Sequence, residues 1–128
     1  MKLQLTKEEI SNAILSALCN GALSDLYSSG IGIGYESSVY RFHKQEGDCY
    51  EDVLIRMINA GEPVDLCDLE NDGETIGQIT LEKAIEFINS TEDEHAIQVI
   101  QQLVNEEDDS ETGFCFLQFI ALGEIVYG

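Results

Sequence analysis

The chain has 128 residues, 44% of them hydrophobic, so it is long and apolar enough to fold as a single domain spanning residues 1–128. Its 25 acidic residues outnumber its 6 basic ones, and the formal net charge is −19. Six cations are too few to track a phosphate backbone, which argues against direct binding to nucleic acids or to anionic membranes.

The first part of the chain predicts a helix. Residues 6–9 have the form of a capping box, and apolar residues recur behind them at helical spacing over residues 7–19, before the stop signal of Gly21. Residues 2–5 alternate in polarity and form either a short strand or a lead-in. Residues 22–29 fit one more helical turn.

A glycine-rich segment, residues 30–34, comes before the first predicted long strand. Residues 35–43 alternate between polar and apolar side chains, which predicts a strand. In such a strand Tyr35, Arg41 and His43 would share one face, because successive side chains point to opposite sides.

The middle of the chain predicts a helix over residues 50–60 and then a β-hairpin. Residues 64–69 and 74–79 alternate in polarity around an Asp-Gly pair, which is a strong hairpin signal. Pro63 stands just before the first of these strands, where a missing amide does least harm.

The remaining segments complete the predicted fold. Thr80 can cap one helix, residues 91–94 form a second capping box, and a helix near residues 113–122 is apolar almost all round and should be buried. Residues 124–127 read as a closing strand. The predicted class is α+β: a small antiparallel sheet of about four strands with four to five helices packed on it.

The four cysteines, Cys19, Cys49, Cys67 and Cys115, lie far apart and form no CxxC pair. Their number alone allows an extracellular disulfide framework, but their spacing is more typical of buried thiols in a reduced cytosol. The N-terminus lacks the apolar run of a signal peptide, and no segment approaches transmembrane length. We therefore expect a cytoplasmic protein.

The residues that could carry catalysis or hold a metal do not form a recognisable motif. If Asp68 began a calcium loop, Ile79 would stand where an EF-hand needs its bidentate carboxylate. The only histidines, His43 and His95, have no second ligand four residues away, and no nucleophile turn is present. We expect a non-enzymatic protein without a metal or a cofactor.

The glycine segment is the first candidate site. It precedes a predicted strand, whereas dinucleotide and phosphate loops follow a strand and open a helix. Without Cβ atoms it could let a ligand approach the backbone, with Tyr35 stacked on a base and Arg41, helped by Lys44 or Arg56, neutralising a phosphate. The sequence is equally compatible with a β-bulge whose Tyr35 side chain packs on the core and binds no ligand. The candidate ligand-binding residues are Gly32, Gly34, Tyr35, Arg41, His43, Gln118 and Tyr127.

The acidic stretches 92–94 and 106–111 are the second candidate site. They could present a phosphate-like array to a DNA-binding protein. Acidic residues are also common at the starts of helices and in solvated loops, and this explains the placement of most of the residues in these two stretches. It does not explain a net charge of −19.

Three segments carry a resemblance: the helix opening at residues 5–10, a Gly-x-Gly-Tyr segment at 32–35, and a Gln-x-x-Ala-Leu-Gly-Glu-Ile-Val-Tyr-Gly run at 118–128. In these the sequence resembles small uncharacterised proteins of tailed bacteriophages. It departs from them at Glu36, where relatives often have tryptophan, and at Leu122, where they often have phenylalanine. The resemblance implies no activity, but it implies a phage setting, in which small accessory proteins often counter host defences in the host cytoplasm.

Three functional hypotheses follow. The leading one is a phage accessory protein that sequesters a small ligand such as a host nucleotide immune signal. The alternative is an acidic inhibitor that, like a DNA mimic, binds a basic nucleic-acid-binding protein of the host. The third is an assembly role inside a homo-oligomer, with the apolar last helix at an interface.

Overall fold

The computed structural model describes residues 5–19, 21–35, 37–107 and 109–127. Over these residues the chain forms seven α-helices and one antiparallel sheet of three strands, so the α+β class is confirmed, with more helices and one strand fewer than expected. The elements are α1 (Lys7–Cys19), α2 (Ala22–Ser28), β1 (Ile31–Ile33), α3 (Ser38–His43), α4 (Tyr50–Asn59), β2 (Val64–Asp68), β3 (Glu74–Ile79), α5 (Leu81–Ser90), α6 (Glu94–Val104) and α7 (Ser110–Leu122).

The predicted hairpin is confirmed as β2 and β3, which form the sheet with β1 in the order β1-β2-β3. In its turn, Asp72 has a φ angle of 56° and Gly73 one of 71°. A glycine adopts such a positive φ angle without strain, which suits Gly73 to this position. Leu66 pairs with Gly77 and Cys67 pairs with Thr75, so Ile76 is the extra residue of a β-bulge.

The predicted strand over residues 35–43 is wrong. The strand is the glycine segment itself, β1, and a helix follows it. The side chain of Ser37 accepts a hydrogen bond from the backbone N–H of Tyr40 at 3.1 Å, which caps α3 and commits the chain to a helical turn. Within α3, Tyr40 is buried and Phe42 is exposed, whereas in a strand these two side chains would share one face, so their burial also fits the helix.

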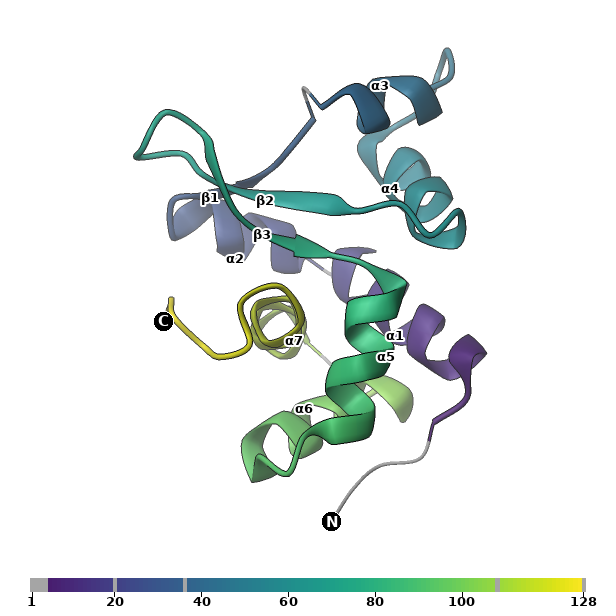
Figure 1. Ribbon diagram of the computed structural model, residues 1–128, viewed down its shortest axis with the longest axis vertical. Helices are drawn as coiled ribbons and strands as arrows, with labels where there is room; N and C mark the ends of the chain where they lie inside the picture. Colours follow the sequence, from purple (N-terminus) through teal and green to yellow (C-terminus); the bar gives the residue numbers. More distant parts are fainter. Residues whose placement is uncertain (1–4, 20, 36, 108, 128) are drawn as a thin grey trace.

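The last helix, α7, is the centre of the fold. It contacts α1, α2, α5, α6 and β3, and together with α2 it lies on one face of the sheet (Figure 1). Neighbours on every side explain why its sequence is apolar almost all round and confirm that it is buried. At Gly77 a Cβ atom would lie 2.7 Å from the backbone oxygen of Ala121, so only glycine lets β3 come this close to α7.

Helix starts are confirmed at two of the three predicted caps. Thr6 and Glu9 form the reciprocal capping box, with bonds of 3.1 and 2.9 Å, and Thr80 caps α5 through the N–H of Lys83. The third prediction, that Thr91 caps α6, is wrong. Asp93 caps this helix instead, because its carboxylate accepts from two backbone N–H groups of the first turn.

The closing strand expected at the end of the chain is absent from the described residues. Residues 124–127 form no strand; they follow α7, which ends at Gly123 in the left-handed conformation, as a segment without regular secondary structure. Of the short strand considered at residues 2–5, only Leu5 belongs to the described part, and it packs against the core. Across the described residues, every helix is too short or too polar to span a membrane.

Candidate functional site

A recess lies between α2, β1 and the start of α4. Its volume is about 230 Å³. It is lined by Leu23, Ser24, Leu26, Tyr27, Ile31, Gly32, Ile33, Tyr35 and Tyr50. None of these side chains is charged, and three of them are tyrosines from different elements; we call this feature the tyrosine recess.

Local turns place the strand and the central tyrosine of the recess. Gly30, with φ of +86°, turns the chain from α2 into β1 in the left-handed conformation that glycine favours. Ile31 and Ile33 then point into the core, where they are 1% and 8% exposed. After β1 the N–H of Tyr35 donates to the carbonyl of Ile33 at 2.9 Å, a tight turn that directs Tyr35 away from the sheet.

The Tyr35 ring stands against two other aromatic rings. Its centroid is 5.2 Å from that of the buried Tyr40 and 6.1 Å from that of Tyr50, with interplanar angles of 75° and 64°. Both are edge-to-face geometries, which aromatic rings prefer. Burial, and then the neighbouring Tyr50 and Tyr40, raise the pKa of Tyr35 to about 12, so it stays neutral at physiological pH. Tyr35 is therefore partly packed and partly displayed, with 39% of its surface exposed.

The two glycines serve packing over β1. A Cβ atom on Gly32 would lie 2.8 Å from Leu69, and one on Gly34 would lie 3.0 Å from the Cβ of Asp65. The space that a missing side chain leaves is thus filled by hairpin residues of this chain. On the side where a Cβ atom would stand, neither glycine is open to a ligand, although other backbone atoms of Gly32 line the recess.

The expected alignment of Tyr35, Arg41 and His43 on one face of a strand does not exist. Arg41 and His43 lie on α3, and Arg41 lines a shallow depression with Lys44, Gln45, Glu46 and Gly47, outside the tyrosine recess. The ring of His43 lies edge-to-face against Phe42, with centroids 5.1 Å apart.

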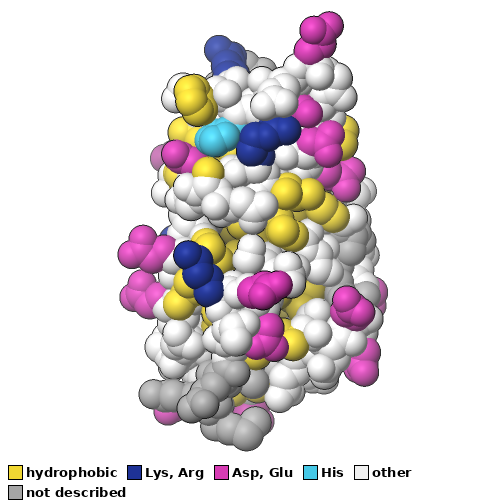
Figure 2. Space-filling model, turned by 90° about the vertical axis from the view of Figure 1, so that its right-hand side faces the viewer, with side chains coloured by type: hydrophobic (Ala, Val, Ile, Leu, Met, Phe, Trp, Pro, Cys, Tyr) yellow, Lys and Arg dark blue, Asp and Glu magenta, His cyan; other side chains and the backbone are white. Residues whose placement is uncertain are grey.

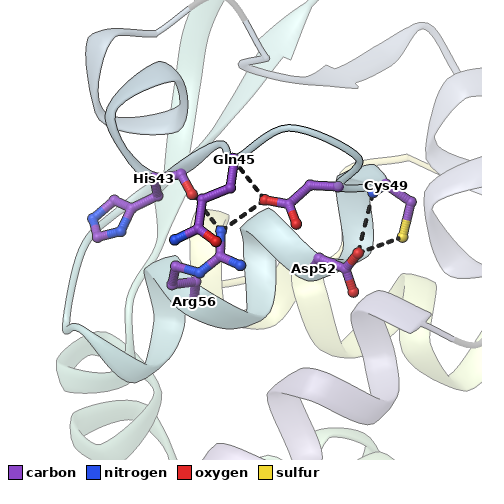
Figure 3. Close-up of polar contacts among 6 residues, drawn as sticks. His43, Gln45, Cys49, Asp52 and Arg56 are labelled. Carbon is purple, nitrogen blue, oxygen red and sulfur yellow. Dashed lines mark hydrogen bonds and ion pairs between the residues drawn. The ribbon is translucent and has the colours of Figure 1, made fainter.

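Arg56, considered as a further phosphate ligand, stabilises the loop between α3 and α4. Its Nη1 donates to the carbonyl of His43 and, at 2.8 Å, to the carboxylate of Asp48 (Figure 3). The same carboxylate oxygen accepts from the N–H of Gln45 at 2.7 Å, and these bonds, that of Arg56 first, lower the pKa of Asp48. Next to this loop, Asp52 accepts from the N–H and the thiol of Cys49 and so holds the start of α4 (Figure 3).

Gln118 and Tyr127 lie together but do not line the tyrosine recess. The side chain of Gln118 is fully buried on α7, where it accepts from the N–H groups of Val126 and Tyr127 and donates to the carbonyl of Tyr127. Its role in the structure is to hold the segment after α7.

Carboxylates, histidines and thiols do not converge in the described part of the chain: no group of three or more of them could hold a metal ion there. At the hairpin turn, Asp68 accepts from the N–H of Glu70, and Glu74 accepts from the side chain of Asn71. The four cysteines are free, and the expectation that they are buried is wrong, since each is exposed or half-buried. Partial burial raises the pKa of Cys19 and Cys115 and favours their neutral thiols.

The carboxylates themselves are at the surface. None of the described aspartates and glutamates is buried, and Figure 2 shows acidic side chains spread over one whole face of the molecule. Some of the cations are engaged inside the fold, among them Arg56 as above and Lys83, whose Nζ donates to the carbonyl of Ala121 near the end of α7 at 3.3 Å. The outward field of the protein is therefore negative.

Comparison of the chain with protein-family models, with curated proteins and with solved structures finds no significant match in any of the three. Function is therefore argued from the geometry of this chain.

Tyr27 and Tyr50 are the two tyrosines of the recess that were not among the candidate residues predicted from the sequence. Tyr27 belongs to α2, and Tyr50 is the first residue of α4. They stand 8 residues before and 15 residues after Tyr35. The three lie in separate elements joined by turns, so no single helical or strand period relates them, and only the tertiary structure reveals that they belong together.

Proposed function

We propose that this chain is a non-enzymatic binding protein whose acidic surface occupies the nucleic-acid-binding surface of a basic protein. The observation that carries the proposal is a net charge of −19, with none of the described carboxylates buried. Even if each of the 6 cations paired with one of the 25 carboxylates, 19 carboxylates would have no cation of their own. Such a field attracts cationic partners and repels anionic ones. The resemblance to phage proteins supports a host protein as the partner.

Capture from bacterial lysate, followed by binding measurements with the purified captured protein, tests this proposal. The recovered proteins should be basic and should normally bind nucleic acid. Their affinity should fall steeply as salt rises from about 50 mM to about 500 mM, because the Debye length shrinks over that range. Duplex DNA should compete for the same surface. Recovery of neutral or acidic proteins, or binding that salt and DNA leave unchanged, would contradict the proposal.

A charge-reversed variant makes the test specific to side chains. Glu106→Lys with Glu107→Lys changes two exposed residues of the α6–α7 loop and should weaken binding. Asp109 is left intact because it caps α7 through Thr112, whose hydrogen bonds lower its pKa. The matched control, Glu106→Gln with Glu107→Gln, changes the net charge half as much and should weaken binding less.

Sequestration of a small nucleotide is the second candidate function. It is supported by Gly32 and Tyr35, which line one recess as expected. It ranks second because that recess has no cationic lining and, at about 230 Å³, is smaller than the roughly 300–1,000 Å³ typical of small-molecule sites. Calorimetric titration with cyclic nucleotides and ADP-ribose derivatives tests it, and the absence of binding to folded protein across that panel would eliminate it.

A further inference from the structure

The tyrosine recess has the size of a single side chain. Its volume of about 230 Å³ is too small for a typical metabolite but large enough for one long amino-acid side chain. Tyr27 is 71% exposed and Tyr50 is 44% exposed, so the rim is open to a partner protein. Exposed tyrosines around a small hollow are typical of the centre of a protein–protein interface.

The surroundings of the recess favour a cation. Burial, and then the neighbouring Glu51, raise the pKa of the Tyr50 hydroxyl, and the carboxyl group of Glu70 lies against Gly30 at the start of β1. Asp25 follows the lining residue Ser24 on α2. The lining itself is uncharged, so nothing inside the recess would repel a positive group.

Aromatic faces attract cations through their quadrupoles, and the attraction strengthens when water is excluded. The Tyr35 and Tyr50 rings meet at 64°, so they offer two walls of different orientation, with Tyr27 lining the same hollow. We propose that the tyrosine recess receives an arginine side chain of the basic partner. This inference rests on the proposed function and names the side chain through which the partner is anchored.

Arginine fits this recess better than lysine. Its guanidinium is planar, stacks on aromatic faces and is weakly hydrated, so it enters a partly apolar hollow with less loss of hydration than an ammonium group. Long-range attraction to the acidic surface cannot distinguish the two, because both carry one positive charge. Arginine can also pair bidentately with surface carboxylates, so the signature of the recess is an arginine preference that is lost when a recess tyrosine is replaced, and salt dependence is the signature of the surface.

The test uses two peptides of equal length and charge, nona-arginine and nona-lysine, titrated into the full chain at fixed salt. The wild type should bind nona-arginine roughly tenfold more tightly. Tyr27→Leu should abolish most of this preference and leave the fold intact, since Tyr27 is largely exposed. Phe42→Leu is the matched control: Phe42 is 83% exposed but lies on α3 outside the recess, so the preference should remain. Nuclear Overhauser effects from arginine side-chain protons to tyrosine rings should accompany binding.

The outcomes separate this inference from the proposed function. Equal, salt-dependent affinities for both peptides that Tyr27→Leu does not change would overturn the arginine site and leave the acidic surface standing. Failure of both peptides to bind, with the protein folded, would overturn both. An arginine preference that Phe42→Leu removes and Tyr27→Leu leaves unchanged would move the site to α3 and also overturn the inference.

Discussion

Replacing Gln118 with methionine should release the segment after α7 from the rest of the protein. The buried amide of Gln118 makes three hydrogen bonds to this segment, at 2.9 Å from the N–H of Val126, 2.8 Å from the N–H of Tyr127 and 3.0 Å to the carbonyl of Tyr127. Methionine has a similar length and volume but can make none of them. Ile125 and Tyr127, which pack against the core, should then lose their anchor.

The size of the effect follows from these bonds. Each contributes about 1 kcal/mol to the free energy of unfolding, so their loss removes about 3 kcal/mol. Burial of a more apolar side chain offsets about 1 kcal/mol of this loss. A net loss of about 2 kcal/mol should lower the Tm by roughly 6–10 °C for a domain of this size.

Urea unfolding followed by circular dichroism measures this loss, and hydrogen exchange of the Val126 and Tyr127 amides locates it. Gln101→Met is the matched control, because Gln101 is exposed on α6. If Gln118→Met were as stable as Gln101→Met and both amides kept their protection, the clamp described for Gln118 would be refuted.

Two further predictions concern the start of α6 and the ring of Tyr35. Asp93→Ala should lower the free energy of unfolding by about 1 kcal/mol, because the carboxylate of Asp93 accepts from the N–H groups of His95 and Ala96. Thr91→Ala should lower it much less. Equal losses for the two variants in urea unfolding would show that Thr91 is the cap after all. The pKa of Tyr35 is raised from 10.0 to about 12, so its neutral form stabilises the fold fully below pH 10, and this contribution disappears as pH rises from 10 to 12. Tyr35→Phe should therefore lose less stability than the wild type across that interval, as measured by alkaline unfolding with tyrosinate absorbance, and identical curves would contradict the assignment.

The features that were correctly predicted depend on residues close together in the sequence. The capping box at residues 6–9, the cap at Thr80, the Asp-Gly hairpin and the end of α7 at Gly123 each involve groups a few positions apart. Such local hydrogen bonds and turns form in much the same way in any fold that contains them.

The predictions that were wrong depended on choices between two locally acceptable structures. Residues 35–43 alternate like a strand, but they also contain a serine that can cap a helix, and the cap is what forms. The segment after α7 reads as a strand, yet its bonds go to the side chain of Gln118 and not to the sheet. Pairing partners for a strand are supplied by the tertiary structure, which a local pattern does not contain.

The amino-acid sequence by itself determines the charge of this protein, because net charge is a sum over residues and does not depend on how they are arranged. It thereby supports the proposal of a cationic partner. Only the tertiary structure decides where Tyr35 stands, since its neighbours come from α2 and α4, which have no fixed spacing from it in the chain. Arg41 and His43 are separated from Tyr35 by a local interaction: the cap at Ser37 turns the chain into α3, and these two residues lie outside the recess.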